Sequence, residues 1–234
     1  MVQEGHELKH LKVDLIRFMM AYKFALEEVN TKFHILQEEF QYMHEYNPIE
    51  HIKSRMKSPE SILKKVKKKG LELSIPSIQH HIRDIAGIRI NCSFTKDIYE
   101  ICNMLTSQKD ITLIEVKDYI KNPKPNGYRS LHLIIQVPIF MSDRVENVYV
   151  EIQIRTIAMD FWASLEHKIY YKYNKDVPSK LKEELKEAAE QATLLDQKME
   201  KLHMEMDNIK AKDSIVNEDT LLFPVDIFQA MLKG

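Results

Sequence analysis

The sequence has little that would place the protein outside the cell or in a membrane. It contains two cysteines among 234 residues, and both Cys92 and Cys102 stand in apolar surroundings, which argues for buried thiols in a reducing compartment. More than half of the first fourteen residues are polar or charged, so no signal peptide is visible. No apolar run approaches the roughly 20 residues of a membrane span. We therefore expect a cytoplasmic protein with no membrane partner.

Net charge and composition bear on the possible partners and on the size of the core. A formal net charge of −1 gives no overall attraction to nucleic acid, so any affinity for a polyanion must come from a local patch. We expect no requirement for nucleic acid. With a hydrophobic content of 44%, the chain can bury a sizeable core, most simply as one α/β domain with helical extensions.

Three segments alternate apolar and polar residues with the period of a half-buried β-strand. They run from Ile88 to Phe94, from Leu131 to Ile139 and from Val148 to Thr156. If they share one sheet, their second face carries two carboxylates, two arginines and a histidine. These residues are Asp84, just upstream of the first segment, Arg89, His132, Glu151 and Arg155. The simpler interpretation is a solvated antiparallel face, as on any half-exposed sheet.

The loop at 118–129 favours a binding site over that simpler interpretation. It holds two of the eight prolines and one of only five glycines. Asn126-Gly127 favours a tight turn, and the prolines stiffen the approach to it. Basic side chains near an aromatic ring form a composition that binds phosphates while the ring stacks on a base. The basic residues are Lys117, Lys121, Lys124 and Arg129, and the ring is Tyr128. A plain hairpin needs no such cluster, although a lone basic loop is common.

A basic patch lies between residues 53 and 69, where eight lysines and arginines face one acid, Glu60. A solvated lysine face explains most of the later lysines. Arg55 and Lys57 are better candidates for ligand contact because they precede the predicted helix, and Lys65 because it faces away from the last lysines.

Within this patch a short helix is predicted. Ser58 is a suitable N-cap, Pro59 a first-turn residue and Glu60 an acid that matches the helix dipole, while Gly70 supplies a stop. Its buried stripe is expected to consist of Ile62, Leu63 and Val66.

Both ends of the chain predict long amphipathic helices, because apolar residues recur at three- and four-residue steps. The first stripe runs from Leu8 to Met43 and the second from Leu181 to Ile209. Packing on the chain's own core is the default explanation, and a subunit interface is the second, because the helices are longer than one domain obviously needs. We divide the chain into an N-terminal helical region (1–45), a central domain (46–176), a C-terminal helix (177–212) and a tail of unknown role (213–234).

Taken together, the motifs resemble the synthetase domain of the RelA/SpoT-type alarmone enzymes, over roughly residues 45 to 175. The order and spacing of the motifs make the resemblance specific, although no single motif is. The chain is short and lacks a His-Asp dipeptide, so it is similar to a small synthetase without the hydrolase domain. The motifs are Arg83 to Arg89, Asn122 to His132 and Val150 to Thr156, extended by Arg55 to Lys65 and Phe161 to His167.

This resemblance implies transfer of pyrophosphate from ATP to the ribose 3′-hydroxyl of GDP or GTP, giving ppGpp or pppGpp and AMP in the stringent response, with no hydrolase activity. The fold class implied is α+β, a nucleotidyltransferase-like mixed β-sheet flanked by helices. It also implies Mg²⁺ as cofactor and a homo-oligomer, a tetramer held largely by the terminal helices.

Residue roles follow from the same resemblance. Asp84 and Glu151 match the catalytic carboxylates and metal ligands, in agreement with the preference of Mg²⁺ for oxygen and of an attacking hydroxyl for a base. Arg55 and Arg89 match the pair that stacks on adenine, and Tyr128 matches the ring that stacks on guanine. The residues near the ATP phosphates are Lys57, Ser61 and Lys65. The other residues of the acceptor side are Lys117, Lys124, Asn126, His132, Gln153 and Glu166.

Two points stay open at this level. Glu115-Val116-Lys117-Asp118 is a hybrid of the basic and acidic patterns that the long enzymes carry before this loop, so the sequence does not decide between GDP and GTP. Two other classes of function are a nucleotidyltransferase acting on protein or RNA and a silent binding module. The first usually shows Gly-Ser followed by two aspartates spaced by one residue, which this sequence lacks, and the second has no need of both Asp84 and Glu151.

Overall fold

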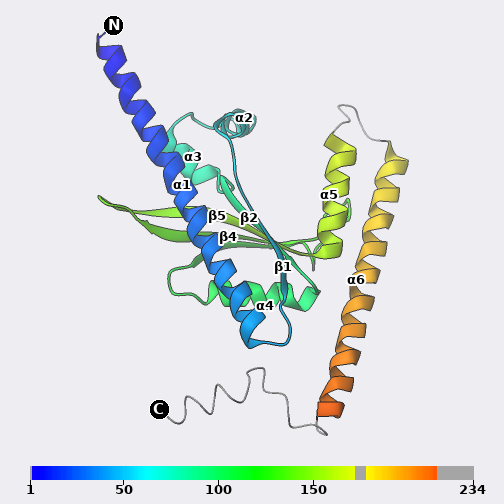
Figure 1. Ribbon diagram of the computed structural model, residues 1–234. Coiled ribbons are helices and arrows are strands. Elements are labelled where there is room, and N and C mark those ends of the chain that lie inside the picture. Colours follow the sequence, from blue (N-terminus) through cyan, green and yellow to red (C-terminus); the bar gives the residue numbers. More distant parts are fainter. Residues whose placement is uncertain (1, 172–177, 215–234) are drawn as a thin grey trace, which may run out of the picture. The chain divides into compact units, whose positions relative to one another are not determined.

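A computed structural model describes the backbone of residues 2–171 and 178–214 and the side chains of residues 9–169 and 178–210 (Figure 1). Its described elements are six helices and five strands. In chain order they are α1 (Val2–Met43), β1 (Ile49–Met56), α2 (Pro59–Lys69), α3 (Ile75–His81), β2 (Ala86–Cys92), α4 (Thr95–Thr106), β3 (Thr112–Asp118), β4 (Leu131–Phe140), β5 (Val145–Thr156), α5 (Ile157–Tyr171) and α6 (Ser179–Ser214).

The five strands form one mixed sheet in the order β1-β2-β5-β4-β3. Strands β2 and β5 pair in parallel, and the other three pairs are antiparallel. Because β2 and β5 are parallel neighbours, residues far apart in the sequence share one register, with Gly87 opposite Glu151 and Arg89 opposite Gln153. The mixed sheet with long terminal helices confirms the predicted fold class.

One face of the sheet forms the hydrophobic core. Strand β4 alternates buried and half-buried residues along nearly its whole length, and β5 does the same from Val148 to Ile154. Helix α1 crosses this face and α4 packs on it beside β2 and β5. The fully buried strand residues include Ile88, Ile90, Leu133, Ile135 and Ile152. Burial of this face leaves the opposite face for the polar residues.

Two details of the sequence interpretation are wrong. Strand β2 ends at Cys92, whereas the predicted strand ran to Phe94; Phe94 instead stands at the N-terminus of α4, and its N–H donates to Asp97 Oδ2 at 3.0 Å. In α2 only Ile62 and Val66 are buried, while Leu63 is 41% exposed. An 11-residue helix presents one narrow stripe to the core, and Leu63 lies beside that stripe.

The ends of α2 are as predicted. The Ser58 side chain accepts from Ser61 N, Pro59 lies in the first turn, and Gly70 adopts a left-handed φ of 63° at the C-cap. Ser61 itself is exposed and accepts a hydrogen bond from Ser58 Oγ at 3.1 Å.

The long N-terminal helix buries only part of its predicted stripe. Phe18, Tyr22, Val29 and Phe33 are buried against the sheet, whereas Leu11 is 63% exposed. The stripe is therefore not used along its full length by the core of one chain. Among the described residues, no helix is long and apolar enough to span a membrane.

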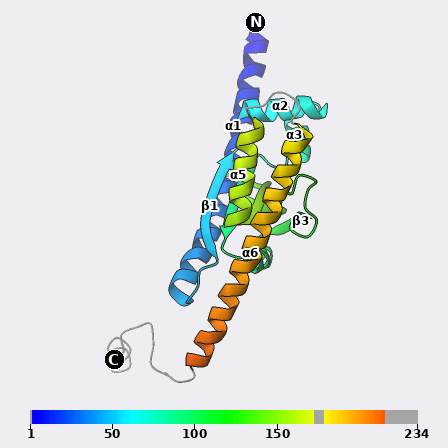
Figure 2. The same ribbon diagram turned by 90° about the vertical axis from the view of Figure 1, so that its right-hand side faces the viewer.

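The chain divides into two units, and the boundary lies between Asp196 and Gln197 within α6. Within the first unit, α5 and the start of α6 run side by side, and Trp162 Nε1 donates to the carbonyl of Leu185 at 2.9 Å (Figure 2). The predicted tail at 213–234 lies outside the described residues, apart from the last two residues of α6, and the division into four regions stays a prediction.

Candidate functional site

A row of polar residues crosses all five strands on the face opposite the core. The register pairs Lys53 with Arg89, Arg89 with Gln153, Gln153 with His132, and His132 with Lys117. The adjacent row contains Arg55, Gly87 and Glu151. Because strand side chains alternate between faces, all of these groups project to the same side of the sheet.

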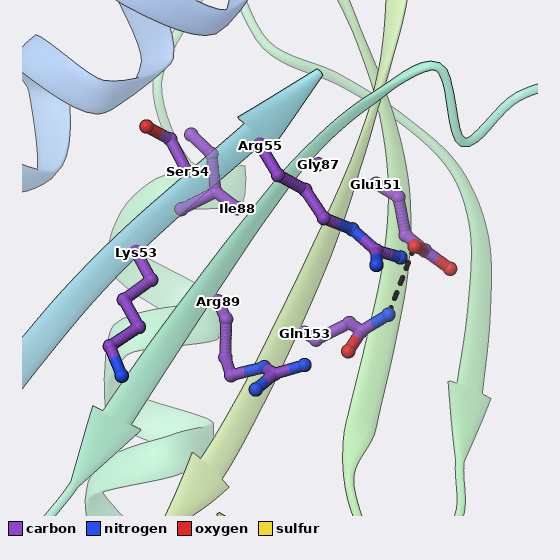
Figure 3. Close-up of a pocket in the computed structure, with 8 residues that line it drawn as sticks. All are labelled: Lys53, Ser54, Arg55, Gly87, Ile88, Arg89, Glu151 and Gln153. Atoms are coloured by element: carbon purple, nitrogen blue, oxygen red, sulfur yellow. Dashed lines mark hydrogen bonds between the residues drawn. The ribbon is translucent and has the colours of Figure 1, made fainter. Parts of the chain in front are cut away.

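A pocket of about 220 Å³ lies over these rows between β1, β2 and β5. Figure 3 shows Arg55, Arg89, Glu151 and Gln153 pointing into the same space, with Gln153 Nε2 donating to Glu151 Oε2 at 3.0 Å. The pocket is lined by Lys53, Ser54, Arg55, Gly87, Ile88, Arg89, Glu151 and Gln153. It therefore gathers predicted residues of both the ATP side and the acceptor side.

The side chain of Arg55 lies over Gly87. A Cβ at Gly87 would make ordinary van der Waals contact with Cγ and Nε of Arg55, each at 3.9 Å, and the arginine extends past the glycine toward Glu151 (Figure 3). Arg55 pairs with Gly87, and Arg89 stands two residues further along β2, a separation of roughly 6.6 Å along the strand. A flat ring between the two guanidinium groups would lie within the cation–π range of both, about 6 Å.

Asp84 lies in the turn before β2, next to Lys57, which precedes α2, and Lys65, which lies within that helix. Its Oδ2 is 2.5 Å from Lys65 Nζ and 3.2 Å from Lys57 Nζ. Burial alone would raise the pKa of Asp84, but the hydrogen bond from Lys65 and the charges of both lysines outweigh it, so the pKa lies below its usual value. The carboxylate is ionised at neutral pH.

Glu151 is the second half-buried carboxylate of the site, with a side chain 16% exposed. Burial raises its pKa, but hydrogen bonding and charge from His132 and a bond from Gln153 outweigh this, and the net pKa is lowered. Its Oε1 lies 3.7 Å from His132 Nδ1. The charge of Asp84 acts in the opposite direction and raises the pKa of Glu151.

These carboxylates fit a hard divalent cation. Asp84 Oδ1 is buried and has no hydrogen-bond partner in the described structure, so it is an oxygen with an open coordination position. Among the described residues no three His, Cys, Asp or Glu side chains cluster to enclose a metal. Mg²⁺ is commonly held by one or two carboxylates together with water and substrate phosphates, and Asp84 and Glu151 match that donor set.

Tyr128 stands at the other end of the polar rows, held by its hydroxyl. Arg155 Nη2 donates to the Tyr128 hydroxyl at 2.6 Å, and His132 Nε2 lies 2.8 Å from the same oxygen. Lys124 Nζ lies 4.7 Å from the centroid of the Tyr128 ring and 4.6 Å from that of Tyr119. The ring is therefore held by its hydroxyl and stands beside the cation of Lys124.

The loop that carries Tyr128 is shaped by a close approach to α6. Gly127 has a φ of 88°, and a Cβ there would lie 2.5 Å from Cβ of Ala189, so both the backbone conformation and the packing require glycine. Asn126 Nδ2 donates to Glu166 Oε1 at 3.2 Å, which connects the loop to α5.

Three of the predicted basic residues differ in their surroundings. Lys117 pairs with Glu115 at 2.9 Å. Lys121 lies over the ring of Tyr99, and Arg129 Nη1 donates to the carbonyl of Ile120 at 2.9 Å. Arg129 thus stabilises the loop, and only part of the basic cluster surrounds Tyr128.

Three further residues lie at this site, and the sequence patterns assign none of them a role. Lys53 lines the pocket, and Arg155 and Asp160 join by a salt bridge at 3.0 Å. The alternation of β5 placed Arg155 on the polar face, but its partner Asp160 stands in a helix, where no periodicity distinguishes it. Ser61 is the one predicted ATP-side residue that has neither a place in the pocket lining nor a contact with Asp84 among the described interactions.

Comparison with known proteins identifies the family. The model of the region found in RelA/SpoT proteins matches residues 54–176. The GTP pyrophosphokinase YwaC of Bacillus subtilis is 56% identical over 201 residues, which cover 86% of this chain and 96% of that protein. The chain therefore belongs to the RelA/SpoT family, and within it to the small alarmone synthetases.

Solved structures agree in fold. The small alarmone synthetase 1 of Bacillus subtilis bound to its product pppGpp superposes with a TM-score of 0.76 at 39% identity, covering 82% of this chain and 97% of that one. The same enzyme bound to AMPCPP gives 0.70 at 35% identity, with 83% and 98% covered.

Proposed function

We propose that this enzyme transfers pyrophosphate from ATP to the 3′-hydroxyl of GDP or GTP and releases AMP. The 3′-oxygen forms a bond to the β-phosphorus of ATP, and the bond between that phosphorus and the α,β-bridging oxygen breaks. The observation that carries the proposal is an arginine-lined pocket with the carboxylate of Glu151 in its lining, flanked by Asp84 beside two lysines and by a tyrosine held through its hydroxyl. Named relatives that are GTP pyrophosphokinases, and one bound to pppGpp, support it.

The adenine of ATP would lie between Arg55 and Arg89. The pocket spans the sheet positions of both guanidinium groups, and cation–π stacking on a base is strongest where water is excluded. Lys57 and Lys65, both beside Asp84, would then contact the phosphates, and Ser61 at the N-terminus of α2 would support them.

The acceptor would occupy the Tyr128 side, with its base on the tyrosine ring. Lys117, Lys124, Asn126, His132, Gln153 and Glu166 would surround it. In this arrangement Glu151 faces the acceptor ribose and would take the proton of the 3′-hydroxyl, while Asp84 and Glu151 would hold Mg²⁺. When bound, Mg²⁺ would neutralise charge on the transferred group. We further propose that the enzyme acts in the cytoplasm in the stringent response, does not hydrolyse its product, and needs no nucleic acid.

Incubation of the protein with ATP, Mg²⁺ and either GDP or GTP tests this function. We expect one AMP released for each ppGpp or pppGpp formed, and no breakdown of added ppGpp. Pyrophosphate release with label entering protein or RNA would instead indicate a nucleotidyltransferase. Binding without any turnover would indicate a silent nucleotide-binding module. The ratio of the two products also decides between GDP and GTP.

We propose in addition that the chain forms a homo-oligomer, a tetramer, through its terminal helices. Beyond its buried stretch, α1 exposes Leu11, Leu15, Ile16 and Met20, all between 43% and 63% exposed. Such contiguous apolar residues on a helix are typical of an interaction surface. The exposed residues Leu194, Leu195, Met199 and Leu202 give α6 a similar face.

Light scattering should therefore give a mass several times the 27.7 kDa of one chain. Leu11→Glu should lower that mass, because a charge cannot be buried in an apolar interface without a partner. Leu73→Glu is the matched control, because Leu73 is 65% exposed and lies outside both terminal helices. A monomer at all concentrations contradicts the proposal.

A further inference from the structure

One carboxylate joins the two halves of the site. Asp160 stands in the first turn of α5 and is 14% exposed. Its Oδ1 accepts hydrogen bonds from Arg89 Nη1 at 3.1 Å and from Arg155 Nη1 at 3.0 Å, and its Oδ2 accepts one from Asn91 Nδ2 at 3.1 Å. A single side chain therefore fixes two guanidinium groups that come from different strands.

The two arginines lead to different parts of the site. Arg89 lines the pocket, with a side chain 32% exposed. Arg155 has a side chain only 5% exposed, so it is a link inside the structure and not a contact for a ligand. From Asp160 it extends to the Tyr128 hydroxyl at 2.6 Å and to Gln153 Oε1 at 2.9 Å, and its guanidinium carbon lies 5.1 Å from the centroid of the Tyr128 ring.

The charges make the shared carboxylate necessary. Burial lowers the pKa of Arg89, the neighbouring charge of Arg155 lowers it further, and the charge of Asp160 opposes both. Without that negative charge, the half-buried Arg89 and the buried Arg155 would repel each other across a gap that, among the described residues, Asp160 bridges. Either guanidinium would then move from the position in which it serves its own half of the site.

We propose that Asp160 is a positioning residue that couples the ATP subsite to the acceptor subsite. It holds Arg89 on the adenine side and, through Arg155, Tyr128 on the guanine side. The proposal rests on the proposed function for the identity of the two nucleotides. When either nucleotide immobilises its arginine or tyrosine, the shared carboxylate becomes more ordered, so the second nucleotide binds at a lower entropic cost.

The variant Asp160→Asn keeps the size of the side chain and removes the charge. We expect it to raise the KM for ATP and the KM for the acceptor, each by about tenfold, because both arginines lose a charge-assisted bond. Asn91→Ala is the matched control: it removes the third hydrogen bond to Asp160 and leaves both arginine contacts in place. It should lower the melting temperature without raising either KM.

A double-mutant cycle that combines Asp160→Asn with Arg155→Gln separates the effect of Asp160 on ATP, through Arg89, from its effect on the acceptor, through Arg155. Because Asp160 acts on the acceptor through Arg155, the two changes should be non-additive for the acceptor KM. They should also be non-additive for the ATP KM, where the double variant should do better than Asp160→Asn alone, because removing Arg155 also removes the cation that would repel Arg89. Additive effects on both, or a rise in only one KM for Asp160→Asn, would overturn the proposal. So would a loss of activity that only follows the unfolded fraction and is matched by Asn91→Ala.

Calorimetry with AMPCPP and GDP, each alone and in the presence of the other, provides a readout that needs no turnover. In the wild type, each ligand should tighten the binding of the other by about fivefold or more, and Asp160→Asn should abolish that coupling. If the wild type binds both nucleotides with coupling but makes no product, the proposed function fails while the role of Asp160 stands. If it makes product without any coupling, the role of Asp160 fails while the function stands.

Discussion

Replacing Asp84 by Asn should lower the rate of alarmone synthesis by at least about 10²-fold, because the amide keeps the shape but loses the charge that would hold a metal. The structure adds a second expectation. Asp84 Oδ2 lies beside both Lys57 and Lys65, and without that carboxylate the lysines are available for phosphates. ATP affinity measured without Mg²⁺ should therefore be retained or increase while turnover is lost.

Glu151→Gln should have an effect of the same size. The amide can neither take the proton of the 3′-hydroxyl nor act as a charged ligand, although its oxygen can still accept from Gln153. Glu146→Gln is the matched control, since Glu146 lies on the same strand and pairs with Arg144 at 2.5 Å, away from the pocket. Its synthesis rate should stay near that of the wild type.

An anchoring role for these acids predicts a different pattern. If Asp84 and Glu151 only tie strand ends to neighbouring cations, each variant should lower the melting temperature, with activity falling in proportion to the unfolded protein. Thermal unfolding and product formation measured on the same samples separate the two cases. Folded variants that synthesise at near wild-type rate would remove both residues from the catalytic role.

Local patterns were sufficient to predict the elements around the site. The alternation of β4 and β5 depends only on residues two apart, so it correctly placed His132, Glu151 and Gln153 on one face. Ser58, Pro59 and Gly70 predicted the ends of α2 because capping is also local. Such signals are present in a single sequence because their physical cause lies within a few residues.

The features that the sequence could not predict depend on contacts between residues that are far apart in the sequence. The parallel pairing of β2 with β5 sets Gly87 beside Glu151, yet no property of either strand alone specifies that neighbour. Asp160 reaches Arg89 across 71 positions, and before the fold is known it is one acid among the 35 of the chain. For Arg129 the prediction failed in the opposite way. The composition of its loop suggested a ligand contact, but its guanidinium donates to a carbonyl of the same loop.

Replacing Tyr128 by Ala should weaken the use of GDP or GTP by tenfold or more and change ATP binding little. A ring that stacks on a base contributes about 1–3 kcal/mol, and this ring stands on the acceptor side, fixed by Arg155 and His132. Tyr128→Phe keeps the stacking face and loses both hydroxyl contacts, so its effect should be smaller than that of Ala. Tyr42→Ala is the control, because Tyr42 is 72% exposed and lies on α1.

Variants of Arg55 and Arg89, the two arginines of the ATP side, should affect ATP more than the acceptor. Arg55→Ala or Arg89→Ala removes cation–π stacking from adenine, so the KM for ATP should rise more than the KM for the acceptor. For Arg89 the separation should be less complete, because its loss also leaves Asp160 with Arg155 as its one arginine partner among the described contacts. Steady-state kinetics with each substrate varied in turn measures both constants. Equal losses for the two substrates in Tyr128→Ala would mean that the ring shapes the site as a whole and does not select the acceptor base.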